Sequence, residues 1–388
     1  MIRFERRLTT PRWFGIAVPL GSILLALVLA GIVLAATGHD PFATYRRIGE
    51  ASFTEPGALG QTLIASTPLL FTGLAVAVAF RMKVWNIGGE GQLYMGALGA
   101  SGVGLALSHL PGPALIVAMT VGGVLAGSLW AAVPGALRAY LNTNEILTSL
   151  MLNYVAGLLL YYLIYDSKSY WRDLVSPAAK VFPQGKYLPS KGTWPALPIG
   201  SLDVPLGLLV GIAVGAILWW MIRATRYGFE MRVISDSPNA ARYAGMRTRR
   251  KILSVMAISG ALAGLGGASQ VGDFAHVLDP RGLQAAGFGY TGIVVAALAR
   301  YNPIAVVVVS FLIGALTNAG FALQGPGFPI GLVGTMEGIL LFCVLGGEIV
   351  ARYRIHVTRR PAAAKGGPPA EPPPGAPEPI SVGEVPAG

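Results

Sequence analysis

The chain has 388 residues, of which 53% are hydrophobic, 12% are charged and 52 are glycine. A soluble domain carries about 25% charged residues and about 7% glycine, so this composition excludes disorder for most of the chain and argues against a soluble multidomain enzyme. It indicates a polytopic membrane protein. The formal net charge of +11 would suggest nucleic acid in a soluble protein. In a membrane protein the positions of Lys and Arg indicate topology instead. We therefore expect the protein to lie in a lipid bilayer and to bind no nucleic acid.

Ten apolar stretches approach the roughly 20 residues that a helical membrane span needs, although two of them are short. In chain order they are residues 14–36, 59–80, 93–107, 114–137, 146–165, 204–222, 252–272, 289–299, 304–323 and 330–349. We therefore predict an all-α membrane protein with about ten transmembrane helices. A signal peptide is the alternative for residues 14–36, but its apolar region is usually about 7–15 residues long. We keep this stretch as the first span.

The positions of Lys and Arg orient these spans. With a cytoplasmic N-terminus, the inside segments hold 21 of the 29 Lys and Arg residues and the outside segments hold eight. Because cytoplasmic loops are enriched in positive residues, ten spans with both termini in the cytoplasm fit best.

This topology divides the chain into three parts, and the middle part contains two long loops. A Pro-rich end with no aromatic residue predicts a disordered tail, because nine of the 28 prolines lie in residues 361–388. The parts are a cytoplasmic N-terminus (1–13), a transmembrane domain (14–350) with a periplasmic loop (166–203) and a cytoplasmic loop (223–251), and a cytoplasmic tail (351–388).

Glycines spaced four residues apart recur inside the predicted spans. Such pairs let helix backbones approach closely where lipid offers no hydrophobic contrast. Any single pair can arise by chance in a Gly-rich chain, but together they favour a tightly packed bundle. The pairs are Gly123 with Gly127, Gly211 with Gly215, Gly260 with Gly264, and Gly334 with Gly338.

Two Gly-rich segments, residues 85–92 and 287–292, interrupt the helical pattern. Irregular backbone inside a bilayer is tolerated only where protein buries it or where it lines a cavity. In transporters, Gly-interrupted helices at corresponding places in two halves indicate the substrate site. The first break starts a helix that runs outward and the second starts one that runs inward, as an inverted repeat would require. The alternative is an ordinary turn at the membrane surface, which Arg81 and Lys83 favour for the first break.

Few polar residues lie within the spans. Amides in a span are more often interhelical hydrogen bonds than substrate ligands, whereas an intramembrane acid is a functional candidate. These residues are Gln61, Asn153, Gln270, Asn318 and Glu337. The absence of a chain of acids counts against a proton-coupled carrier.

The loop 223–251 holds eight Lys and Arg residues. Within it, residues 235–245 predict a short helix, with Ser237 as the N-cap, Pro238 in the first helical position and Gly245 at the end. Such a helix can insert into a cleft on a partner; the alternative is a surface loop held by anionic lipid.

Four motifs in this order resemble the permeases of ABC importers for nucleosides and simple sugars, and specifically the guanosine-uptake branch. They are NIGGEGQLYMGA (86–97), NEILTSLMLNY (144–154), SGALAGLGGA (259–268) and GFGYTGIVVAAL (287–298). The resemblance runs from about residue 59 to residue 346. It implies a type II-like importer fold in a bacterial cytoplasmic (inner) membrane. It also implies three kinds of partner: a second, homologous permease forming a heterodimer, a cytoplasmic ATPase, and an extracytoplasmic substrate-binding lipoprotein.

The resemblance also implies that residues 225–246 carry the coupling helix that contacts the ATPase. Ser235 and Ser237 depart from the family pattern, in which Gly and Asn are expected. The coupling residues are Arg232, Asp236, Pro238, Asn239, Ala240, Ala241, Tyr243 and Gly245.

We therefore predict an ATP-driven importer subunit for nucleosides, with purine nucleosides favoured. The chain has no G-x-x-x-x-G-K-[ST] motif, so we expect no enzyme activity of its own, no metal or cofactor, and ATP bound by the partner. The alternatives are the same architecture importing ribose, another simple sugar or a branched-chain amino acid, an ion-coupled secondary carrier, and a scaffold protein. The predicted substrate path comprises Asn86, Glu90, Gln92, Asn153, Phe288, Tyr290 and Thr291.

Overall fold

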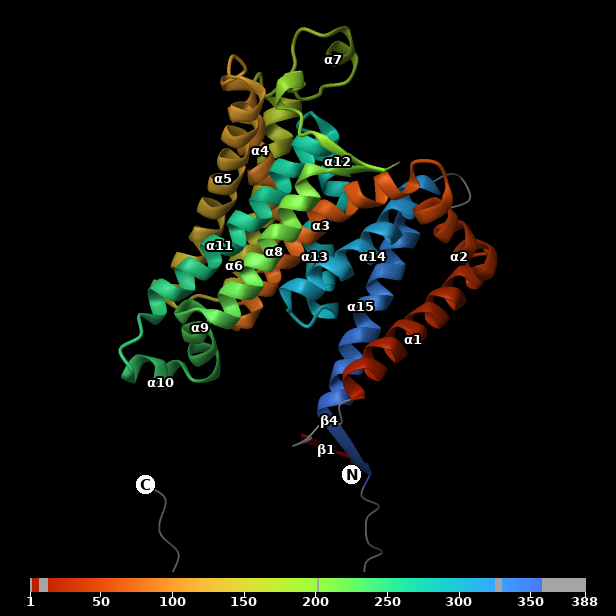
Figure 1. Cartoon of the computed structure of the whole chain (residues 1–388), viewed down its shortest axis with the longest axis vertical. Coiled ribbons are helices and arrows are strands. Elements are labelled where there is room, and N and C mark those ends of the chain that lie inside the picture. Colours follow the sequence, from red (N-terminus) through yellow and green to blue (C-terminus); the bar gives the residue numbers. More distant parts are fainter. Residues whose placement is uncertain (1, 7–12, 201, 325–329, 358–388) are drawn as a thin grey trace, which may run out of the picture.

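The computed structural model describes residues 2–6, 13–200, 202–324 and 330–357. These residues form a bundle of long helices with short elements at both ends (Figure 1). The membrane helices and their extensions are α1 (Phe14–Ala36), α3 (Ala58–Arg81), α4 (Gly89–Ala106), α5 (Gly112–Leu141), α6 (Glu145–Tyr161) with η2 (Tyr162–Asp166), α8 (Leu206–Ala224), α11 (Thr248–Ser269) with η4 (Gln270–Ala275), α13 (Phe288–Leu298), α14 (Pro303–Ala322) and α15 (Ile330–Arg352). The shorter helices are α2 (Pro41–Gly49) with η1 (Glu50–Thr54), α7 (Pro177–Val181), η3 (Ser190–Gly192), α9 (Arg226–Asp236), α10 (Pro238–Tyr243) and α12 (Pro280–Ala286).

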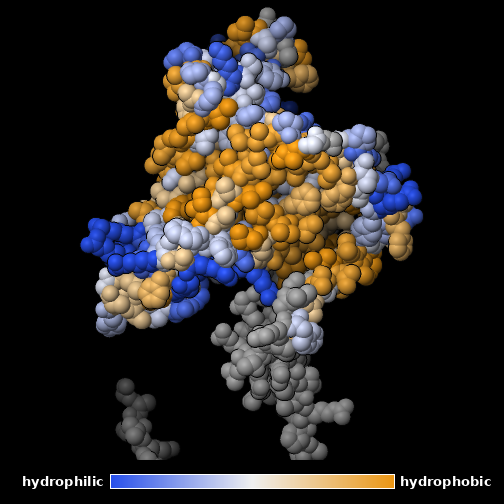
Figure 2. All heavy atoms as spheres, in the orientation of Figure 1, coloured by the Kyte–Doolittle hydropathy of each residue, from blue (hydrophilic) through white to orange (hydrophobic). Residues whose placement is uncertain are grey.

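Each of the ten apolar stretches coincides with one of these helices, so the predicted all-α membrane fold is confirmed. Within the described residues, six helices are long and apolar enough to cross a bilayer, and the pair Leu20–Ala36 and Pro41–Thr54, bent by 118°, adds a seventh candidate. A wide apolar belt runs across the molecule in Figure 2, with hydrophilic surface above and below it. This is the surface that a membrane-embedded bundle presents.

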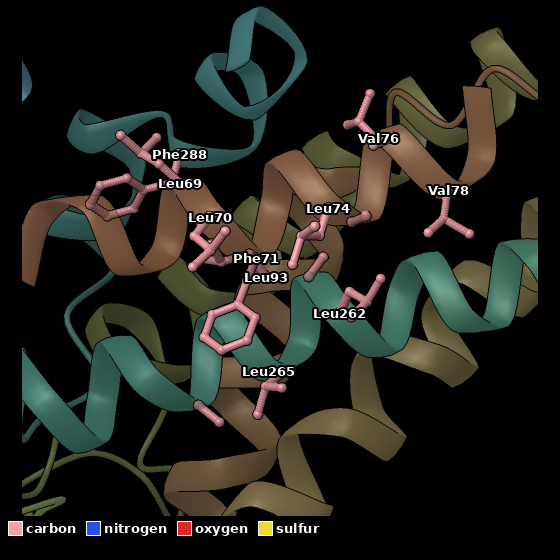
Figure 3. Close-up of a cluster of buried hydrophobic side chains, with 14 of the residues drawn as sticks. Leu69, Leu70, Phe71, Leu74, Val76, Val78, Leu93, Leu262, Leu265 and Phe288 are labelled. Carbon is pink, nitrogen blue, oxygen red and sulfur yellow. The ribbon is translucent and has the colours of Figure 1, made fainter. Parts of the chain in front are cut away.

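Helix α3 forms the centre of the bundle. It is apolar on every side, and residues 66–80 are all buried, because α8, α11, α13 and α14 surround it. Figure 3 shows Phe71 of α3 pointing toward α11, near Leu265. A helix without a polar face has to be enclosed in this way.

Helices α5 and α11 pack with their backbones in close contact. A Cβ added at Gly127 would overlap the backbone of Gly260, and one added at Gly264 would overlap the carbonyl of Gly123. Two of the predicted glycine pairs are therefore partners of each other. The pair Gly334 and Gly338 on α15 differs, because a Cβ at either position meets nothing within 4 Å in the described chain.

The two ends of the described chain pair with each other. β1 (Ile2–Arg6) and β4 (Tyr353–Val357) form an antiparallel ladder with Ile2 opposite Val357, so both ends lie on one side of the bundle. The sequence predicts a disordered tail from residue 351, but α15 continues to Arg352 and β4 follows it. Residues 358–388 lie outside the described residues.

The loop 166–203 carries more structure than the sequence indicated. It contains α7, η3 and β2 (Ala196–Ile199), and β2 pairs with β3 (Leu202–Pro205). Trp171 in this loop donates its indole N–H to the carbonyl of Leu98 on α4 (3.2 Å). The loop therefore packs on the ends of the membrane helices.

Gly260→Val tests the close packing of α5 and α11. The added side chain overlaps the backbone of α5, and overpacking of this kind costs about 1–3 kcal/mol. We expect a lower melting temperature for the purified chain in detergent. Gly338→Val is the matched control, because it places the same side chain in a helix where the first Cβ atom meets nothing. Equal melting temperatures for the two variants would contradict this packing.

Candidate functional site

The two Gly-rich breaks meet inside the bundle. A Cβ added at Gly289, in the first turn of α13, would overlap the backbone of Glu90, in the first turn of α4. From this point α4 runs to the loop 166–203, where Gly102 lies beside Trp171. Helix α13 runs the other way and ends beside α3, where Arg81 donates to the carbonyl of Tyr301 (2.9 Å). The two broken helices therefore start together and run in opposite directions, as predicted.

Glu90 joins these two helix starts. Its carboxylate accepts hydrogen bonds from the backbone N–H groups of Gly289 (2.5 Å) and Tyr290 (3.2 Å) and from the hydroxyl of Tyr94 (2.7 Å). The N-cap residue of α13, Gly287, has no side chain that could accept these backbone N–H groups. Glu90 therefore caps α13 from another helix, because its side-chain oxygen accepts the N–H groups that an N-cap side chain would otherwise accept.

Asn153 on α6 holds the first break. Its Oδ1 accepts from the N–H of Gly91 (2.8 Å), and its Nδ2 donates to the carbonyl of Ile87 (2.9 Å) and to the hydroxyl of Tyr290 (3.4 Å). One buried amide thus satisfies backbone groups of the break and positions an aromatic side chain on α13.

Asn86 and Gln92 lie deeper in the bundle. Their amides form a reciprocal pair, with both N–H···O distances 2.9 Å. Asn86 also donates to the hydroxyl of Ser259 (2.8 Å), which donates in turn to the carbonyl of Ala75 on α3 (2.7 Å). These contacts tie α3, α4 and α11 together. The role of Asn86 and Gln92 on a substrate path stays a prediction.

A cavity of about 480 Å³ lies beside Glu90, between α4, α6, α12 and α13. Its walls hold four tyrosines and two amides. Tyr154 and Leu158 are 65% and 70% exposed, so the cavity is open on the α6 side in the single chain. The lining residues are Glu90, Tyr94, Asn153, Tyr154, Gly157, Leu158, Tyr161, Gln284 and Tyr290.

Three of the predicted path residues, Glu90, Asn153 and Tyr290, line this cavity. Phe288 instead lines a second cavity of about 200 Å³ between α3, η4, α12 and α14, and Thr291 is buried. Gln61, Gln270 and Asn318 also line the second cavity. The side chain of Glu337 lies outside the described part of the structure.

Sequence reasoning missed Tyr94, Tyr154, Tyr161 and Gln284. A signal was present, because Glu90 and Tyr94 are four residues apart, as are the α6 residues 153, 157 and 161. Residues at this spacing share one face of a helix. Extending the helical face from the two predicted residues, Glu90 and Asn153, would have found Tyr94 and Tyr161.

The loop 223–251 carries the predicted short helix, α10. Ser237 is its N-cap and accepts from the N–H of Ala240 (3.3 Å), Pro238 is in the first position, and Gly245 has a φ of +75°. Ala241 is fully buried, whereas Tyr243 is 94% exposed.

Helix α9 packs against α10 and connects it to the membrane helices. Its Glu230 forms an ion pair with Lys251 at the start of α11 (2.6 Å), and the hydrogen bond from Lys251 lowers the pKa of Glu230. Arg232 on α9 donates to the carbonyl of Ile222 at the end of α8 (3.4 Å). These contacts join the short helices to two membrane helices.

The family described as the permease component of the branched-chain amino acid transport system matches residues 58–345. The chain belongs to this family. It is 32% identical to the glucose ABC transporter permease protein TsgB13 of Haloferax volcanii over 94% of this chain and 98% of that protein. It is 33% identical to the guanosine permease NupP of Bacillus subtilis over 77% of this chain and 84% of that protein. It is 26% identical to the nucleoside permease NupB of Lactococcus lactis over 85% of this chain and 90% of that protein. The chain is thus a multi-pass membrane permease of the ABC transporter class.

Glu90→Ala tests the capping role of Glu90 in this permease. It leaves the N–H groups of Gly289 and Tyr290 without their acceptor, and an unsatisfied buried donor costs about 1–3 kcal/mol. We expect a lower melting temperature, with a smaller loss for Glu90→Gln, which keeps one acceptor oxygen. The exposed Glu55→Ala serves as the control. If Glu90→Ala melted at the temperature of the control, the capping role would be wrong.

Proposed function

We propose that this chain is the permease subunit of an ATP-driven importer for purine nucleosides. The observation that carries the proposal is the cavity lined by four tyrosines beside the junction of the two broken helices. Its volume of about 480 Å³ falls within the roughly 300–1,000 Å³ typical of small-molecule sites.

The chemistry of the cavity suits a nucleoside. A purine ring stacks on tyrosine rings, and such stacking is worth about 1–3 kcal/mol per base. The amide of Gln284, whose Nε2 donates to the carbonyl of Gly157 (3.3 Å), places a further polar group at the cavity wall. It can hydrogen-bond a base edge or a ribose hydroxyl. Glu90 already accepts three hydrogen bonds, so we assign it to positioning Tyr290 rather than to binding.

A second permease subunit completes the site in this proposal. Tyr154 and Leu158 are exposed on α6 at the open side of the cavity. A homologous subunit packed there would enclose the ligand between two chains, in line with the predicted heterodimer. A substrate-binding lipoprotein delivers the ligand from outside, and both termini lie in the cytoplasm of a bacterial cell.

The partner ATPase supplies the energy through α10. Tyr243 is exposed on this helix, while Ala241 anchors it against the bundle. ATP binds and is hydrolysed in the partner, with no metal or cofactor of this chain involved. The coupling residues predicted from the sequence lie on α9, α10 and the Gly245 turn.

The names of the relatives support nucleosides first and a sugar second. NupP and NupB are named for guanosine and nucleosides, and TsgB13 for glucose. A simple sugar is therefore the second candidate, because it too can lie against tyrosine rings.

Reconstituted uptake separates the two candidates. The complex is purified and reconstituted in liposomes together with its lipoprotein. We expect it to accumulate labelled guanosine only when ATP is present on the side of the membrane that the ATPase faces. Excess unlabelled adenosine should reduce that uptake, whereas glucose and ribose should not. Glucose accumulation without guanosine accumulation would establish the sugar reading, and uptake without ATP would contradict the ABC mechanism.

Tyr154→Ala tests the stacking wall. Loss of one stacking ring, worth about 1–3 kcal/mol, should raise the guanosine concentration for half-maximal uptake roughly tenfold. Tyr162→Ala is the matched control, since Tyr162 is 57% exposed just beyond α6 and is not among the lining residues. An equal effect of the two substitutions would show that Tyr154 is not part of the site.

Tyr243→Ala tests coupling. Removing the exposed ring from α10 should lower ATPase activity stimulated by the ligand-loaded lipoprotein and leave ligand binding unchanged. Phe229→Ala on α9, which removes another exposed ring, is the control. Normal stimulation in the Tyr243 variant would place the ATPase contact elsewhere.

A further inference from the structure

A third cavity, the basic hollow, lies beside α10 on the cytoplasmic side. Its volume is about 620 Å³, and it is enclosed by the end of α5, the turn after α3, the junction of α9 and α10, and the start of α11. Lys83, Arg138, Arg242 and Arg249 line it, with no carboxylate among the described lining residues. The hollow is therefore strongly basic.

Two of these cations have neither an ion pair nor a side-chain hydrogen bond within the described chain. Arg138 pairs with Glu145 (3.2 Å), and Lys83 donates to the carbonyl of Ser235 (2.7 Å). Arg242 and Arg249 form no ion pair with any described residue. Two guanidinium groups on the wall of one hollow favour an anion, and phosphate in particular, because its oxygens match the planar N–H fork of Arg.

A buried hydroxyl and a helix start point to the same chemistry. Thr248 lines the hollow and is 8% exposed, and its Oγ1 has no hydrogen-bond partner in the described structure. Thr248 is also the first residue of α11, a helix of 22 residues whose N-cap, Arg247, makes no side-chain cap. Free N–H groups and the helix dipole at such a start attract phosphate. The unpaired hydroxyl supplies one more donor.

The apolar surface of α5 leads directly to the hollow. Val117, Val121, Leu125, Leu129 and Val133 form an exposed stripe at four-residue spacing. Two turns after Val133 the same face reaches Tyr140, which is 55% exposed and lines the hollow. An acyl chain along the stripe would bring its phosphate to the basic residues. A lipid therefore fits both surfaces, whereas a free anion would use only one of them.

We propose that this hollow binds the phosphate headgroup of an anionic phospholipid in the cytoplasmic leaflet. Arg242 and Arg249 pair with the phosphate, and Thr248 donates a hydrogen bond to it. Basic pockets between membrane helices on the cytoplasmic side bind such headgroups. Because Pro238 and Arg242 of α10 form part of the wall, the bound lipid holds the coupling element against the end of α5. The site does not depend on which solute is imported.

Native mass spectrometry of the complete purified complex tests the site. Phosphatidylglycerol and phosphatidylcholine are added separately to the wild type, to Arg242→Gln with Arg249→Gln, and to Arg247→Gln with Arg250→Gln. The second pair removes the same charge from the same loop but does not line the hollow. The lining pair should weaken phosphatidylglycerol binding about tenfold or more, since each basic residue near the surface contributes to headgroup affinity. The control pair should bind as the wild type, and phosphatidylcholine binding should be the same in all three.

Thr248→Val provides a milder test, because valine keeps the shape of the threonine side chain. It removes only the unpaired hydroxyl, and we expect about tenfold weaker phosphatidylglycerol binding, because a hydrogen bond to a charged group is lost. Equal phosphatidylglycerol binding in the lining variants and the control would overturn the proposal. Water-soluble glycerol 3-phosphate that binds as tightly as the lipid would overturn the lipid source in favour of a free anion. Loss of the ATPase from the lining variants with unchanged lipid binding would assign the hollow to the ATPase.

Discussion

The backbone groups at helix ends inside the bundle have to be satisfied without water, and the structure around the junction of α4 and α13 depends on this constraint. An isolated N–H group in hydrocarbon costs several kcal/mol, so a helix can start in mid-membrane only where protein acceptors await it. Helix α13 has 11 residues, and at about 1.5 Å per residue it spans only half of a hydrocarbon core of roughly 30 Å. Glu90 supplies the acceptor for its start, and Asn153 does the same for the break before α4. The same contacts place Tyr94 and Tyr290 on the wall of the cavity.

This arrangement also needs backbones to approach closely. Glu90 reaches α13 because residue 289 is glycine, and α5 reaches α11 because glycines face each other at residues 127 and 260. The high glycine content is thus concentrated at contacts between particular helices. Helices fixed in this way can transmit movement as rigid elements. Such a connection runs from α10 through α9 and Lys251 to α11, which packs against α3, α4 and α5. The basic hollow behind α10 lies beside the same connection.

Much of the fold could be predicted from the sequence because it follows from local composition. Apolar length located the helices, glycine clusters located the two breaks, and Ser237 with Pro238 located α10. The site was only partly predictable. Asn153 was recognised as a polar residue within a predicted span, and Tyr290 as an aromatic residue of the second break. That Asn86 donates a hydrogen bond to Ser259 depends on a tertiary contact across 173 residues, which one sequence does not encode locally. Tyr154 lies in an ordinary apolar span next to Asn153 and not on its helix face, and only the position of α6 beside α4 makes it part of the cavity.

A structure of the complete importer bound to a purine nucleoside tests the central claim most directly, namely that the tyrosine-lined cavity is the transport site. Cryo-electron microscopy of the complex, with ATP hydrolysis blocked to retain the ligand, would locate the bound solute. The account predicts density for a purine ring against Tyr154 or Tyr290, enclosed on the α6 side by the second permease subunit, with Glu90 still bound to the start of α13. Ligand density elsewhere, with the cavity filled by lipid or by side chains of the second subunit, would contradict it.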